Sequence, residues 1–65
     1  MKPETVERHI KSLRDTNPFI RGSATLSLKK IGKPALELLK PAFEKEKDKE
    51  VKQRIKDVIE QIRKS

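Results

Sequence analysis

The sequence predicts an all-α fold in which four helices form two antiparallel helical hairpins. Apolar residues recur at spacings of three and four, and no stretch alternates with a period of two. Asn-Pro and Gly-Lys-Pro segments mark the first two breaks between the periodic stretches. The apolar spacing of the first half also returns in the second half. We expect helices over residues 3–14, 18–31, 34–45 and 50–64.

The first two helices are predicted from one apolar face each and from the break between them. At about 100° per residue, the apolar residues of the first helix share one face. That face consists of Val6, Ile10 and Leu13. Asn17 is a favourable N-cap and Pro18 a favourable first helical residue, so a second helix should begin there. Its core face consists of Ile20, Ala24, Leu28 and Ile31.

The third and fourth helices follow a tight corner. Gly32 suits the left-handed position that ends a helix, and Pro34 suits the first turn of the next one. The third helix then presents Ala35, Leu36, Leu39, Ala42 and Phe43. A polar run over residues 44–49 predicts a turn. The fourth helix carries a narrow apolar stripe of Val51, Ile55, Val58, Ile59 and Ile62.

The second and fourth helices repeat one another at an offset of 31 residues. Ile20, Ala24, Leu28 and Ile31 match Val51, Ile55, Ile59 and Ile62. Hairpins that recur at this period cannot bury their apolar faces alone and stack on a neighbour. We therefore expect a single domain over residues 1–65, with one repeat over 3–32 and a second over 34–64.

A set of residues around the second helix has the spacing of a known family. It comprises Asp15, Ile20, Arg21, Ala24, Leu28, Ile31 and Gly32. This pattern resembles that of HEAT repeats, particularly the short HEAT-like kind, and the resemblance extends over nearly the whole chain. It implies a minimal HEAT-like α-solenoid that offers an interaction surface and no chemistry. It also implies structural roles for Asp15 and Arg21, which would tie successive repeats together, and for Ala24 and Gly32.

The second repeat departs from the family pattern at three positions. Lys52 stands for the Arg, Ile55 for the small residue and Arg63 for the Gly. Such changes suit a terminal repeat, whose last helix has no following repeat. Two repeats are fewer than the about three that stable stacks usually need, so the pair is well packed or copies associate.

Composition limits the function classes. The chain has 65 residues, of which 32% are hydrophobic and 42% charged, and its net charge is +7. It has no cysteine and one histidine, His9, which argues against a structural metal. Its serines lack a positioned base and its glycines form no phosphate-binding loop. We expect no enzyme, no cofactor and no membrane span, and a cytoplasmic location; the Lys and Glu content would suit a thermophile.

Phe19 and Leu26 form a second apolar face on the second helix, about 120° from its core stripe. One interpretation is that the middle of a four-helix stack uses both faces internally. The other is that both residues stay partly exposed and bind another copy or a protein partner, because exposed aromatic patches usually mark contacts. A homodimer through a two-fold contact is the simplest form of the second interpretation.

Five basic residues lie away from the core stripes of the second and fourth helices. They are Arg21, Lys29, Lys52, Lys56 and Arg63. They are either solubilising charge or a strip along one groove that attracts nucleic acid or an acidic protein segment. With no Trp or Tyr, nucleic-acid binding would be phosphate-directed, weak and non-specific. The sequence therefore favours a small non-enzymatic interaction module, with a basic nucleic-acid-binding protein as the alternative.

Overall fold

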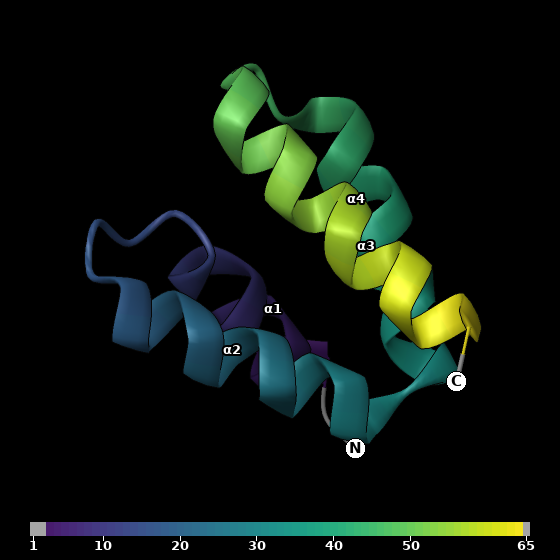
Figure 1. The fold of residues 1–65 in the computed structure, drawn as a ribbon. Helices are drawn as coiled ribbons and strands as arrows, with labels where there is room; N and C mark the ends of the chain where they lie inside the picture. Colours follow the sequence, from purple (N-terminus) through teal and green to yellow (C-terminus); the bar gives the residue numbers. More distant parts are fainter. Residues whose placement is uncertain (1–2, 65) are drawn as a thin grey trace.

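A computed structural model describes residues 3–64 of the chain, which fold into four helices (Figure 1). They are α1 (Pro3–Ser12), α2 (Pro18–Ile31), α3 (Lys33–Lys45) and α4 (Lys49–Lys64). No strand occurs among residues 3–64. The prediction of an all-α fold is confirmed.

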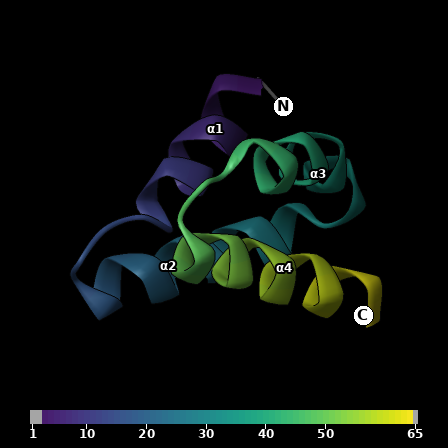
Figure 2. The ribbon, with the colours of Figure 1, turned by 90° about the horizontal axis from the view of Figure 1, so that it is seen from above.

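The helices form two hairpins that pack side by side. Helix α1 packs on α2 and α3 packs on α4, while α1 also contacts α3 and α2 contacts α4. Figure 2 shows the result as two layers, with α1 and α3 in one and α2 and α4 in the other. This is the arrangement of stacked helical hairpins in an α-solenoid.

The core lies between the two layers and is entirely apolar among the described residues. Its buried side chains are Val6, Leu13, Ala24, Leu28, Ala35, Leu39, Val51, Ile55, Val58, Ile59 and Ile62. Helix α4 supplies five of them, more than any other helix. Ile10, Ile31, Leu36, Leu38, Ala42 and Phe43 pack around this set and are partly buried.

Helix α1 ends two residues earlier than expected, at Ser12 rather than at residue 14. The chain tightens into a turn there, because the amide of Leu13 bonds to the carbonyl of Ile10 (3.1 Å) and that of Arg14 bonds to Lys11 (3.0 Å). Bonds to the third preceding residue commonly close the last turn of a helix. Leu13 thus reaches the core from a turn and not from the helix itself.

Side chains and one glycine define the ends of α2. The Asn17 side chain accepts a hydrogen bond from the Phe19 amide (2.9 Å), and Pro18 is the first helical residue, as predicted. At the other end Gly32 has φ 79° and ψ −144°, and its amide bonds to the Leu28 carbonyl (3.0 Å). A side chain is strained at this positive φ, so glycine suits the corner.

The last two helices each begin one residue earlier than expected, at Lys33 and Lys49. For α4 the reason is a cap inside the polar run. One carboxylate oxygen of Asp48 accepts hydrogen bonds from the amides of Glu50 (2.9 Å) and Val51 (3.4 Å). Acceptors at this position satisfy amides that have no partner within the helix.

Candidate interaction surface

The outer face of α2 carries exposed apolar side chains. Phe19 is 85% exposed, Leu26 is 59% exposed and Ile20 is 41% exposed. These three are the exposed large apolar residues of the described chain. The interpretation in which the stack consumes both apolar faces of α2 is therefore wrong, because the second hairpin does not cover Phe19 and Leu26.

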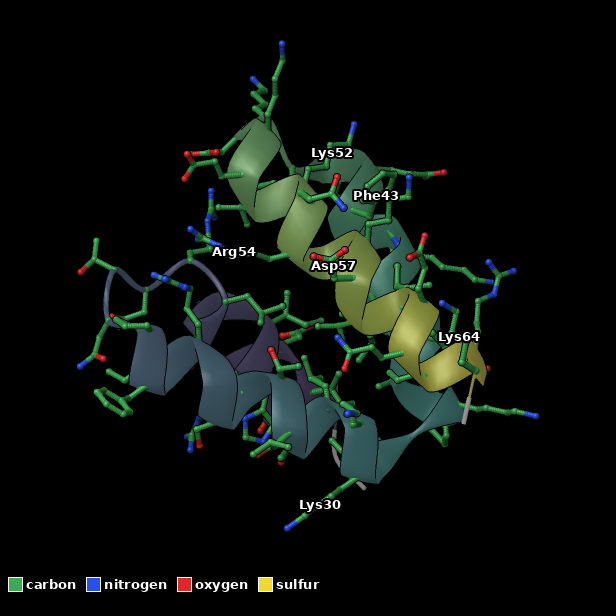
Figure 3. The ribbon with its side chains drawn as sticks, in the orientation of Figure 1. Lys30, Phe43, Lys52, Arg54, Asp57 and Lys64 are labelled. Atoms are coloured by element: carbon green, nitrogen blue, oxygen red, sulfur yellow. The ribbon has the colours of Figure 1, made fainter. Side chains whose placement is uncertain are left out.

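The matching face of α4 carries carboxylates instead. At the offset of 31 residues, Glu50 matches Phe19 and Asp57 matches Leu26, and both acidic residues are exposed. The Asp57 carboxylate accepts a hydrogen bond from the side-chain Nε2 of Gln53 (2.9 Å), and Figure 3 shows Asp57 on the outer side of α4. The same place in the fold thus tolerates polar residues, so the fold does not require Phe19 and Leu26 to be apolar.

Gly22 lies between Phe19 and Leu26 on α2 and has no structural reason to be glycine. It is exposed, and no atom of the described chain outside its own helix turn lies within 4 Å of a Cβ built there. Glycine inside a helix costs about 0.5–1 kcal/mol relative to alanine. In α4 the matching residue is Gln53. Gly22 therefore leaves a notch between two apolar side chains at a cost in helix stability.

Three of the five predicted basic residues lie together on the edge between α3 and α4. The Lys52 Nζ lies 4.8 Å from the centre of the Phe43 ring, and Figure 3 shows the pair on the side of the second hairpin away from α2. Lys56 and Arg63 line a neighbouring hollow of about 270 Å³. Its other lining residues are Lys40, Phe43, Glu44, Ile59 and Glu60.

The other two basic residues belong to the first hairpin. Arg21 is half-buried, and its Nη1 donates to the backbone carbonyl of Asp15 (2.7 Å). The Asp15 carboxylate accepts from the Asn17 amide (2.8 Å). The bond from Arg21 fixes the loop between α1 and α2 to the first turn of α2. Lys29 is exposed on α2.

The polar links between the two hairpins come from residues that the sequence did not single out. Arg54 of α4 donates from Nη1 to the carbonyl of Leu13 (3.1 Å), and Figure 3 shows its side chain directed toward the first hairpin. Arg14 forms an ion pair with Glu46 (2.9 Å), whose side chain is 7% exposed. These partners lie 41 and 32 residues apart, so no local spacing indicates them.

Ala24, whose structural role the resemblance implies, is almost fully buried in the core. Among residues 3–64, no group of three or more His, Cys, Asp or Glu residues is placed to hold a metal ion. None of the described helices combines the length and apolar content needed to cross a lipid bilayer.

Comparison with known proteins adds two findings. A family model described as HEAT repeats matches residues 2–60. Epoxyqueuosine reductase of Bacillus subtilis (strain 168) is 47% identical over 53 residues, which cover 80% of this chain and 14% of that protein. The chain thus spans a small part of the length of this curated relative. No solved structure matches the chain.

Proposed function

The chain belongs to the HEAT-repeat family, and we propose that it is a small non-enzymatic interaction module that binds another protein through the outer face of α2. Residues 3–32 and 34–64 form its two repeats within one domain. HEAT repeats generally mediate protein interactions, which supports the proposal. The proposal includes the cytoplasmic location expected from the sequence.

One observation carries this proposal. Phe19 and Leu26 are exposed on α2 where the equivalent helix carries Glu50 and Asp57. Burying a Phe or Leu side chain contributes about 1.5–3 kcal/mol, so covering both by a partner supplies a substantial driving force. Aromatic side chains beside a notch are also typical of the residues that dominate protein interfaces.

The similarity to epoxyqueuosine reductase concerns a segment of that enzyme. Its name denotes a reductase of epoxyqueuosine, and the alignment covers 14% of its length. We therefore assign to the present chain the contribution of a repeat segment, which is a binding surface, and place no step of the reduction on its residues.

The alternative function is phosphate-directed binding of nucleic acid along the edge between α3 and α4. The grouping of Lys52, Lys56 and Arg63 favours it. Glu44 and Glu60 line the same hollow and reduce its positive potential. Such binding would be weak and would fall steeply as salt rises.

A capture experiment with matched variants tests the proposal. The charged pair variant, Phe19→Glu with Leu26→Asp, gives α2 the kind of residue that α4 carries at the same positions. The control variant, Thr5→Glu with Gln61→Glu, makes the same change in net charge at exposed sites on α1 and α4. Immobilised wild-type and control chains should capture the same protein, before and after nuclease treatment, and the charged pair variant should lose it.

Two results would contradict binding through the outer face of α2. Capture that survives in the charged pair variant would remove α2 from the interaction. Capture that disappears with nuclease, or after replacing Lys52 and Lys56 by Glu, would support the nucleic-acid alternative. Circular dichroism should show the same helix content in all variants, because the replaced side chains are exposed or, for Lys52, half-buried over Phe43 at the edge of the second hairpin.

A further inference from the structure

The outer face of α2 is arranged symmetrically about the middle of the helix. Phe19 lies three residues before Gly22, and Leu26 lies three residues after Ser23. Seven residues turn a helix through nearly two full turns, so Phe19 and Leu26 point within about 20° of one direction. Two small residues thus lie between two apolar side chains at equal distances.

This symmetry suits contact with an identical helix that runs in the opposite direction. In such a pair, Phe19 of each copy meets Leu26 of the other, and Gly22 meets Ser23. A two-fold contact requires a surface that is complementary to itself, and this face meets that requirement. Small residues at the crossing allow the helix axes to approach to the lower end of the usual range, about 8 Å.

Charge also favours the antiparallel direction. The same pairing brings Lys30 past the start of α2 in the other copy, on the side of the loop that carries Asp15, and Figure 3 shows Lys30 pointing away from the rest of the molecule. The Asp15 carboxylate is partly exposed. A parallel pair would instead superimpose the Lys29 and Lys30 side chains of the two copies, which like charges disfavour.

We propose that the protein covering the outer face of α2 is a second copy of this chain, with the two α2 helices antiparallel about a two-fold axis between Gly22 and Ser23. The proposal rests on the proposed function and names its partner. Each copy carries a net charge of +7, so long-range repulsion opposes association at low salt.

Sedimentation of the purified chain separates this proposal from the proposed function. The wild-type and control chains should be dimers at about 50 µM. Raising the salt from about 20 to about 300 mM should strengthen their association, because screening removes the repulsion. The charged pair variant should be a monomer, with an association constant at least about 100-fold lower. A wild-type monomer at about 500 µM would overturn the second-copy proposal, whereas capture of a different protein through α2 would still support the proposed function.

Introduced cysteines test the direction of the helices, since the chain has none of its own. Phe19→Cys and Leu26→Cys chains are labelled differently, mixed and oxidised. The mixed disulfide should dominate, because the two position-19 residues of an antiparallel pair lie about 10 Å apart along the axes, beyond the about 4.4–6.8 Å that a disulfide spans between Cα atoms. Dominance of position-19 homodisulfides would overturn the antiparallel arrangement. An Asp57→Cys chain, altered at the α4 position that matches Leu26, should remain unlinked.

Discussion

Helices α2 and α4 occupy equivalent places in the two hairpins but use their apolar residues differently. Helix α4 buries five apolar side chains, and its described residues expose no large one. Helix α2 buries Ala24 and Leu28 and exposes Phe19, Ile20 and Leu26. Helix α4 shows that the stack tolerates a polar outer face on this layer. The apolar outer face of α2 is therefore not required for packing.

The largest effect is expected in the core of α4. Ile55→Ala should lower the free energy of unfolding by about 2–5 kcal/mol, because it removes three buried carbons and leaves a cavity. The measurement is chemical denaturation at low protein concentration, where association contributes little. Leu26→Ala on α2 is the matched control and should change the value by less than about 0.5 kcal/mol. Similar losses from both variants would mean that Leu26 contributes to the monomer core as much as Ile55 does.

The next effect concerns the small residue of α2. Ala24→Leu should lower the free energy of unfolding by about 1–3 kcal/mol, because the site is buried between the layers and has no room for a larger side chain. Thermal unfolding followed by circular dichroism measures it. The matching residue of α4 is already Ile55, so Ile55→Leu should cost less than about 1.5 kcal/mol. An unchanged melting temperature for Ala24→Leu would mean that α2 does not approach its neighbours closely there.

A smaller loss is expected at the link between the hairpins. Arg54→Gln should lower the free energy of unfolding by about 1 kcal/mol, because the Leu13 carbonyl loses its bond to the guanidinium. Urea denaturation measures it. Arg63→Gln, an equal loss of charge on the same helix at an exposed site, should have almost no effect. Equal losses in both variants would assign the effect to net charge and not to the hydrogen bond.

The smallest expected effect is at Gly22, where one substitution should stabilise the monomer and weaken its self-association. Gly22→Ala should raise the stability of the monomer by about 0.5–1 kcal/mol, because the new Cβ meets no neighbouring atom and alanine favours the helix. It should also weaken self-association, because the methyl group fills the notch. Denaturation at low concentration and sedimentation measure the two effects separately. A variant that is more stable and associates equally well would remove Gly22 from the contact.

Most of the fold could be predicted from local chemistry. The apolar period of 3.6 located all four helices, and Asn17 and Gly32 marked the ends of α2 because caps act within one helical turn. Asp48 was missed, since it is one of seven charged residues in a row and nothing in that run marks it as a cap. The tightened turn after Ser12 was missed because Leu13 keeps the apolar period whether or not the helix continues.

The candidate surface could be predicted only in part. The sequence showed that Phe19 and Leu26 share a face, but whether the second hairpin covers that face depends on how the hairpins stack. For the basic residues, angles around each helix do not tell which side meets a neighbour. Lys52 lies over Phe43 of α3, whereas Arg21 bonds to the loop before α2. The bond from Arg54 to Leu13 could not be predicted, because the two residues lie 41 positions apart in the sequence.

The glycine corner has a consequence for the order of folding. Gly32 is the single residue between α2 and α3, so the whole connection between the hairpins depends on one pair of backbone angles. Each hairpin closes between neighbours in sequence, and closing a short loop loses little entropy. Contacts that join distant residues form later. We therefore expect contacts within each hairpin to form before those between the hairpins, such as the bond from Arg54 to Leu13, while Gly32 sets the angle between α2 and α3.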